Sequence, residues 1–159
     1  MTEQPTWYYL ISKYQDQEDS LPIKTTKLSA GFDFKAAEDI TVPAFKPGVK
    51  PVLVPTGIKC MLAPDQVLLC FNRSSNSLKR GLVLANGVGV IDADYFDNPD
   101  NEGHIAGIFW SYGYKPYEIK RGDRIMQGVV VNYQNLANAT IAGLNRTGVF
   151  GSTGVTDHE

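Results

Sequence analysis

The segment from residue 71 to residue 76 (FNRSSN) joins one arginine to two hydroxyl side chains. Arg73, Ser74 and Ser75 come at the end of an apolar run, and hydroxyl residues are typical of a helix start. Backbone N–H groups at a helix start attract anions, and a guanidinium binds phosphate oxygens through paired hydrogen bonds. The segment predicts a phosphate site. An ordinary helix start with Arg73 on the surface is the alternative interpretation.

A second segment, residues 86–95 (NGVGVIDADY), places a carboxylate after a glycine-rich turn. Gly87 and Gly89 allow the backbone to approach a flat ligand closely. Asp92 ends an apolar run, where a carboxylate is costly unless it is paired or used in chemistry. The glycines lack the third glycine and the following helix of a dinucleotide fingerprint, so that interpretation is rejected.

A third segment lies near the C-terminus, at residues 146–154 (RTGVFGSTG). Glycines on both sides of Phe150 would let this arm close over a ligand. Phe150 could then stack on a base while Arg146, Ser152 and Thr153 hold phosphate oxygens. A disordered chain end is the alternative interpretation of the same composition.

Strands must position these segments, because the apolar residues come in short runs rich in β-branched and aromatic side chains. The expected strands are residues 7–11, 52–54, 58–62, 66–71, 87–91, 105–110 and 125–133. Turn residues separate them, and Pro55 to Gly57 is expected to be one such turn. A short helix is expected over residues 74–80, stopped by Gly81. Short strands without long helical intervals predict an all-β antiparallel sandwich or barrel.

The chain of 159 residues is long enough for one domain, with a formal net charge of −2. This balance argues against nucleic acid or an anionic membrane as a partner bound through bulk charge. We see no apolar run of membrane-spanning length and no secretion signal, so a cytoplasmic protein is expected. Cys60 and Cys70 are too few for a disulfide framework and are expected to be buried.

Taken in order, these segments resemble the five motifs of the trimeric dUTP pyrophosphatase (dUTPase) family, and a phage-type member is one interpretation. The matching segments are residues 30–33 (AGFD), 73–75, 86–95, 122–127 (GDRIMQ) and 148–154. The resemblance implies a jelly-roll-like β fold assembled as a homotrimer. Residues 1–137 would form the β domain. Residues 138–159 would form an arm that closes over an active site of a neighbouring subunit.

The activity that the resemblance implies is hydrolysis of dUTP to dUMP and pyrophosphate with Mg²⁺. This reaction keeps uracil out of DNA and supplies dUMP for thymidylate synthesis. Asp92 would act as the general base that deprotonates the attacking water. Gln127 would contact the α-phosphate or that water, and Asp33 would hold the metal through a metal-bound water.

The resemblance also implies a set of substrate contacts. The phosphate oxygens would be bound by Arg73, Ser74 and Ser75. Asn86 and the backbone at Gly87 and Gly89 would read the uracil edge and exclude the 5-methyl group of thymine, while Tyr95 would pack under the deoxyribose. The arm would contribute Arg146, Phe150, Gly151, Ser152 and Thr153.

The chain departs from the family pattern in the second motif and after the third. Asn72 stands where proline is usual and Ser75 where glycine is common, and Asn76 and Ser77 replace a small or apolar pair. An acidic insertion, residues 96–102, follows Tyr95. It is expected to be solvated, and a contact surface for another protein is the alternative.

Two other functions remain open from the sequence. A dCTP deaminase, or a bifunctional enzyme that both deaminates and releases pyrophosphate, would share this fold and much of the phosphate site. A phage-type regulatory protein, whose partner binding is gated by nucleotide, is the alternative from another class. The intact motifs favour dUTP hydrolysis over both.

Overall fold

The structure is a computed structural model that describes residues 7–135 and Gly148. Within these residues the chain forms ten strands, all paired antiparallel, and four short helical segments. The expectation of an all-β antiparallel fold is therefore confirmed. No helix in the described part of the chain is long and apolar enough to cross a membrane.

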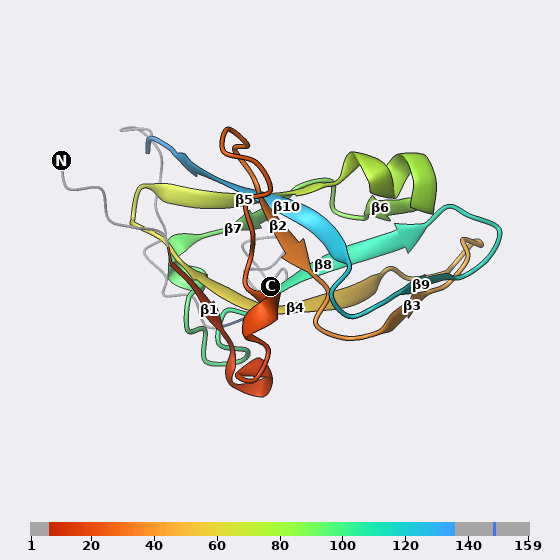
Figure 1. Cartoon of the computed structure of the whole chain (residues 1–159), viewed down its shortest axis with the longest axis horizontal. Coiled ribbons are helices and arrows are strands. Elements are labelled where there is room, and N and C mark those ends of the chain that lie inside the picture. The colour runs from red at the N-terminus through yellow and green to blue at the C-terminus, as the bar shows by residue number, and fades with distance from the viewer. Residues whose placement is uncertain (1–6, 136–147, 149–159) are drawn as a thin grey trace, which may run out of the picture.

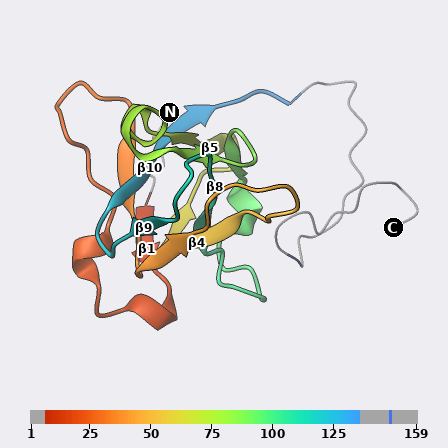
Figure 2. The same ribbon diagram turned by 90° about the vertical axis from the view of Figure 1, so that its right-hand side faces the viewer.

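Two four-stranded sheets and one two-stranded ribbon make up the fold (Figures 1 and 2). The first sheet contains, in spatial order, β1 (Trp7–Leu10), β4 (Val52–Met61), β8 (Ile105–Ser111) and β6 (Leu82–Leu84). The second contains β2 (Phe32–Lys35), β10 (Arg124–Asn132), β5 (Gln66–Asn72) and β7 (Gly89–Ile91). The ribbon pairs β3 (Ile40–Val42) with β9 (Tyr117–Ile119). The helical segments are η1 (Ser12–Tyr14), η2 (Glu18–Ser20), η3 (Asn76–Arg80) and η4 (Ala93–Tyr95).

The main core combines side chains from both large sheets. In β8 every second residue is buried, as expected when one face of a strand packs inward. Phe109 from this strand and Phe34, Leu68 and Met126 from the second sheet belong to the same buried cluster. The alternate positions of the second sheet, including Asp33 and Gln127, consequently point away from the core.

The predicted turn at Pro55–Gly57 is wrong, because β4 runs through it as a single strand. A shift of register between Pro55 and Ile58 marks a bulge against β8, and Gly57 supplies the positive φ of 76°. Buried Thr56 donates its hydroxyl to the carbonyl of Ile105 at 2.5 Å and thus satisfies the irregular backbone. Proline and glycine are typical of both turns and bulges, so the residue types at Pro55 and Gly57 do not distinguish the two.

The predicted short helix is present and lies directly after β5. Ser74 and Ser75 are helical, and η3 continues with the wide turns of a π-helix. Gly81 ends it with a left-handed φ of 67° and donates its N–H to the carbonyl of Asn76. A π-helical turn is rare and often accompanies a functional site.

Candidate active site

Three neighbouring strands of the second sheet bring together residues from distant parts of the sequence. Gln127 on β10 lies opposite Asp33 on β2 and opposite Phe71 on β5. Residues directly opposite each other in a sheet share a face, so Asp33 and Gln127 point to the same side. Arg73 follows the last residue of β5 and begins the turn into η3.

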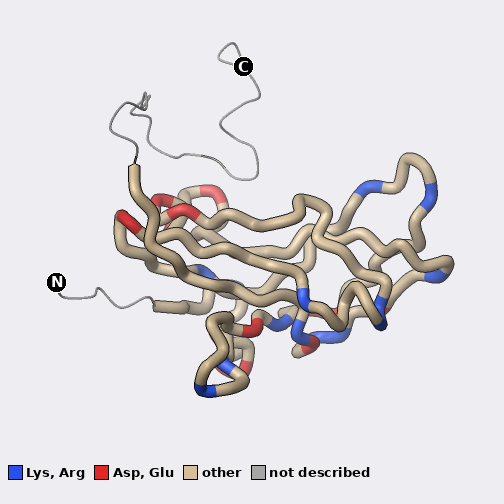
Figure 3. Tube along the Cα trace, turned by 90° about the horizontal axis from the view of Figure 1, so that it is seen from above, with Lys and Arg blue, Asp and Glu red and all other residues tan. Residues whose placement is uncertain are grey.

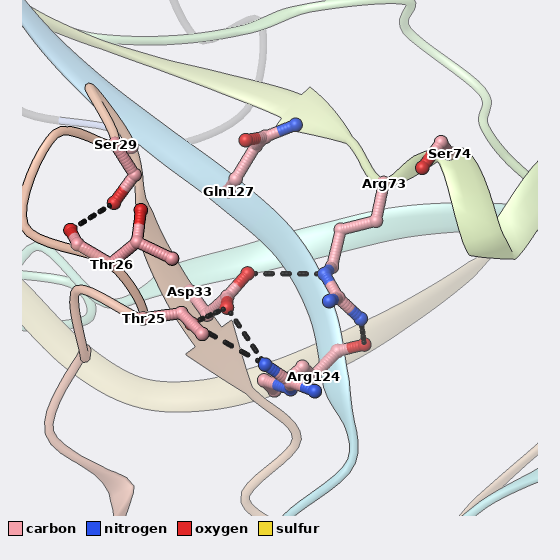
Figure 4. Close-up of a pocket in the computed structure, with 9 residues that line it drawn as sticks. Thr25, Thr26, Ser29, Asp33, Arg73, Ser74, Arg124 and Gln127 are labelled. Atoms are coloured by element: carbon pink, nitrogen blue, oxygen red, sulfur yellow. Dashed lines mark hydrogen bonds and ion pairs between the residues drawn. The ribbon is translucent and has the colours of Figure 1, made fainter.

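These residues line a pocket of about 240 Å³ (Figure 4). It is lined by Thr25, Thr26, Ser29, Gly31, Asp33, Arg73, Ser74, Arg124 and Gln127. Four of the predicted site residues, Asp33, Arg73, Ser74 and Gln127, are therefore gathered in one place. Ser75 lies beside them, and its hydroxyl accepts a hydrogen bond of 3.5 Å from Arg73 Nη1.

Asp33 is the carboxylate around which the pocket is organised. Its Oδ1 pairs with Arg73 Nε at 3.0 Å, and its Oδ2 pairs with Arg124 Nη1 at 3.2 Å. Thr25 donates its hydroxyl to the same Oδ2 at 2.8 Å. The Asp33 side chain is only 12% exposed, so these pairs are stronger than surface ion pairs would be.

The charges of the pocket favour an anion. Two guanidinium groups face one carboxylate, which leaves an excess of one positive charge among the lining residues. Asp33 also fixes the direction of both guanidinium groups before any ligand arrives. Preoriented arginines beside a serine hydroxyl suit the oxygens of a phosphate chain.

Gly31 lets Gln127 reach this position. A Cβ at residue 31 would lie 3.1 Å from Gln127 Oε1, which is tighter than nearly all real contacts. Gln127 Nε2 in turn donates a hydrogen bond of 3.4 Å to the carbonyl of Asn72. The glycine of the first motif thus has a steric purpose.

Sequence reasoning missed several residues of this pocket. Arg124 belongs to the fourth motif, so its position among the matching residues was an available signal. Thr25, Thr26 and Ser29 come from the loop before β2 and carry no pattern that distinguishes them from other loop residues. Only the fold brings that loop to the arginines.

The other predicted substrate residues lie on the turn before β7 and on the segment that follows it. Gly87 has a φ of 74°, and Gly89 lies opposite Cys70, whose Cβ would be 3.2 Å from an added Cβ. These positions therefore favour glycine for both backbone and steric reasons. Asn86 comes directly before this turn, and its Nδ2 lies 4.0 Å from the position of that added Cβ.

Asp92 and Tyr95 bracket the short segment η4. Asp92 is exposed and precedes the first residue of η4. Tyr95 is buried, and its hydroxyl donates to the carbonyl of His104 at 2.9 Å while accepting from Asn101 Nδ2 at 2.7 Å. The Tyr95 ring therefore has a fixed position, and Asp92 is an exposed residue of this chain.

His104 links Tyr95 to strand β4, because its carbonyl accepts the Tyr95 hydroxyl and its side chain contacts Gly57. Its Nε2 accepts the N–H of Gly57 at 2.9 Å, and its ring lies 5.8 Å from that of Tyr14. Burial, with a smaller effect of nearby Lys13, lowers the pKa of His104 to about 4. The imidazole is therefore neutral at pH 7, as its acceptor role requires.

The strand register places Asp92 far from Arg73. Ile91 pairs with Leu68 and Gly89 with Cys70, so β7 runs away from the end of β5 that leads to Arg73. Asp92 comes directly after Ile91, which lies opposite Leu68, so its backbone lies about 20 Å along the strand direction from that of Arg73. One chain thus has two separate candidate half-sites: the pocket, here called the phosphate pocket, and residues 86–95, here called the hairpin region. The strands on either side of the turn at Gly87, β6 and β7, belong to different sheets.

The acidic insertion is more than a solvated loop. Asp97 pairs with Lys59 on β4, and Glu102 accepts the N–H of Ser12. Asn98 is buried and donates to the carbonyl of Gly148 at 2.9 Å. The predicted arm residues Arg146, Phe150, Gly151, Ser152 and Thr153 lie outside the described residues.

A metal would find few protein ligands here. No group of three or more His, Cys, Asp or Glu side chains that could hold an ion occurs among residues 7–135 and Gly148. Asp33 and the surrounding hydroxyl groups are hard oxygen donors, which fit Mg²⁺. Mg²⁺ commonly keeps water ligands and binds through one carboxylate and substrate phosphates, and this donor set is compatible with that mode.

The chain is similar to known proteins in both sequence and fold. A family model described as dUTPase matches residues 17–155. A Lactococcus lactis protein named deoxyuridine 5'-triphosphate nucleotidohydrolase is 40% identical over 148 residues, which cover 92% of this chain and 96% of the relative. A Rickettsia typhi protein of the same name is 34% identical over 149 residues, covering 91% of this chain and 95% of the relative. The crystal structure of dUTPase from Streptococcus mutans superposes with a TM-score of 0.77 at 41% identity, covering 82% of this chain and 98% of that one.

Proposed function

Because this chain belongs to the dUTPase family, we propose that it hydrolyses dUTP to dUMP and pyrophosphate. The observation that carries this proposal is the pocket in which Arg73 and Arg124 flank Asp33. It joins the first, second and fourth motifs in an anion-binding arrangement. The reaction would keep uracil out of DNA and supply dUMP for thymidylate synthesis.

The phosphate pocket would bind the triphosphate. Arg73 and Ser74 would contact phosphate oxygens, with Ser75 supporting Arg73. Gln127, which points into the same pocket, would contact the α-phosphate or the attacking water. Holding reactants in line is a large part of the catalysis of phosphoryl transfer, so fixed guanidinium groups are an advantage.

The hairpin region would select the nucleoside and supply the general base of the reaction. Asn86 and the backbone at Gly87 and Gly89 would read the uracil edge, where the tight turn leaves little room for a methyl group. Tyr95 would pack under the deoxyribose. Asp92 would accept the proton of the attacking water, because it is an exposed carboxylate at the end of β7.

Magnesium fits the pocket as a partner of the triphosphate. Asp33 would hold it through a metal-bound water, with most ligands coming from phosphate oxygens and solvent. When bound, the ion neutralises negative charge on the phosphates. Asp33 would at the same time keep both guanidinium groups in place.

A homotrimer would unite the two half-sites. The separation of about 20 Å along the strand between the backbones of Asp92 and Arg73 favours a site to which two chains contribute. A neighbouring subunit would bring its hairpin region to the phosphate pocket. The arm would then cover the site, with Phe150 on the base and Arg146, Gly151, Ser152 and Thr153 near the phosphates.

The test is pyrophosphate release from dUTP with Mg²⁺, with dTTP, UTP and dCTP assayed in parallel. We expect release from dUTP at a rate at least 100-fold above the other three, because a site built to pair with a polar edge rejects its mismatches strongly. Release from dTTP at a similar rate would contradict the role of the hairpin. Ammonia from dCTP would identify a deaminase, and absence of turnover would favour a nucleotide-gated binding protein.

A further inference from the structure

Two asparagines of the second motif, Asn72 and Asn76, form a hydrogen-bonded pair under the phosphate pocket. Asn76 Nδ2 donates to Asn72 Oδ1 at 2.8 Å. Asn76 has no exposed surface, so its amide depends entirely on partners within the protein. The two asparagines directly flank the predicted phosphate contacts Arg73, Ser74 and Ser75 in the sequence.

The pair has a partner for each of its polar atoms. Asn76 Nδ2 also donates to the carbonyl of Ile125 at 2.6 Å, and its Oδ1 accepts from Arg80 Nη1 at 3.4 Å. Asn72 Nδ2 donates to the carbonyl of Leu82 at 3.0 Å and to Ser77 Oγ at 3.2 Å. A buried polar network that is satisfied throughout fixes one arrangement of the elements that it joins.

The bonds of this pair lead directly to the groups that line the pocket. Asn72 Oδ1 accepts the backbone N–H of Arg73 at 3.0 Å, which fixes the turn from which Arg73 and Ser74 project. The bond from Asn76 to Ile125 ties that turn to β10, one residue after Arg124. The carbonyl of Arg124 accepts from Arg73 Nη1 at 3.3 Å.

We infer that Asn72 and Asn76 are positioning residues, whose amide pair sets the phosphate-binding groups of the active site at a fixed spacing. The inference rests on the proposed function and adds residues to it. Neither side chain lines the pocket, so each acts through Arg73, Ser74 and Arg124.

A positioning role and a general effect on folding can be distinguished by measuring the affinity for the phosphate part of the substrate separately from the affinity for the nucleoside part. Inorganic triphosphate with Mg²⁺ probes the pocket, and deoxyuridine probes the hairpin region, both by calorimetry on the full chain. We expect Asn76→Ala to weaken triphosphate binding about tenfold, the usual scale for one unsatisfied buried group, and to leave deoxyuridine binding unchanged. In hydrolysis of dUTP, KM should rise by about the same factor with kcat changed less than threefold.

Asn72→Ala and the double variant complete a thermodynamic cycle. Each single change removes the hydrogen bond between the two amides, and the double change removes that bond only once, so its loss should be smaller than the sum of the two single losses. Asn72 is only partly buried, so Asn72→Ala can be used for the same binding measurements if Asn76→Ala does not fold. Thr56→Val is the matched control, since it removes a buried hydrogen bond in the other sheet and should lower Tm without changing the ratio of the two affinities.

Equal weakening of triphosphate and deoxyuridine binding would overturn the inference and leave a purely structural role. Additive losses in the double variant would also overturn it, because the two residues would then act separately. If the unmodified protein released no pyrophosphate from dUTP, the proposed function would fail while the triphosphate titration still decided the role of the pair. Failure of the unmodified protein to bind triphosphate would refute both.

Discussion

The phosphate pocket and the hairpin region differ in how their functional groups are held. In the pocket, Asp33 already binds Arg73, Arg124 and Thr25, so the charged groups fix one another. In the hairpin region the ring of Tyr95 is fixed by hydrogen bonds within the chain, and Asp92 is an exposed residue. The charged groups of the pocket thus hold one another within a single chain, whereas the carboxylate residue of the hairpin region lies on the surface of that chain.

This difference follows from the topology. The pocket lies where β2, β10 and β5 are neighbours, so cross-strand pairs bring its residues together within one subunit. The hairpin residues lie before, within and after the edge strand β7, which no further strand covers within the described chain. An edge strand is free to meet another copy of the protein, which agrees with a site completed between subunits.

The largest effect is expected from Asp92→Asn. Asparagine keeps the size of the side chain but cannot accept a proton, so pyrophosphate release from dUTP should fall roughly 1,000-fold or more. Binding of dUTP, measured by calorimetry in the presence of Ca²⁺, should change little. Turnover close to that of the unmodified protein would remove Asp92 as the base and leave the hairpin region without a catalytic role.

Mixing two inactive variants tests whether the half-sites come from different chains. Asp92→Asn keeps the pocket intact and Arg73→Ala keeps the hairpin intact, so chains unfolded and refolded together in equal amounts should regain activity. In this mixture half of the pockets and half of the hairpin regions are intact. If the chains assemble at random, about a quarter of the sites should combine an intact pocket with an intact hairpin region.

The control for this mixing experiment is Asp92→Asn refolded with a chain that carries both changes. That mixture contains no intact hairpin and should stay inactive. Absence of recovery in the first mixture, with both variants folded and assembled, would mean that each site is built within one chain.

The smallest effect concerns the stability of the hairpin region, whose Tyr95 is held by His104. The pKa of His104 is about 4 in the folded chain, against about 6.5 when unfolded. Because the unfolded chain binds the proton more readily, this group lowers stability as pH falls from 7 towards 4. The loss reaches about 2 kcal/mol at pH 5. Lys13, Glu38 and Glu102 are the charged groups that influence its titration.

Urea unfolding at pH 7 and pH 5, at one protein concentration, measures this effect. His104→Gln should reduce the difference between the two pH values by about 2 kcal/mol, because glutamine has no proton to gain. An unchanged difference would show that other groups carry the acid sensitivity.

Much of the pocket was accessible from sequence because its residues belong to short motifs. Arg73 and Ser74 were predicted from the chemistry of a strand running into a helix start, and Gln127 from the resemblance of the fourth motif. The roles of these residues stay predictions, but the structure brings them to one pocket. Arg124 was not singled out, because an arginine inside a motif can face either solvent or a site.

Other features could not be read from the sequence because they depend on contacts between distant segments. The bulge at Gly57 was predicted as a turn, and only its pairing with β8 distinguishes the two. The short strands β2, β3, β6 and β9 contain three or four residues each, too few to give a clear alternating pattern. Tertiary hydrogen bonds stabilise them instead.

The all-β class, the order of the motifs and the residue types that could do chemistry were predictable from the sequence, because they depend on local pattern and on side-chain identity. Which residues share a pocket depends on the fold, since cross-strand register places Asp33 opposite Gln127 and Asp92 about 20 Å along the strand from Arg73. The fold also brings Asn72 and Asn76 into contact under that pocket. Register and burial arise from packing across the whole chain, so no single segment of the sequence contains them.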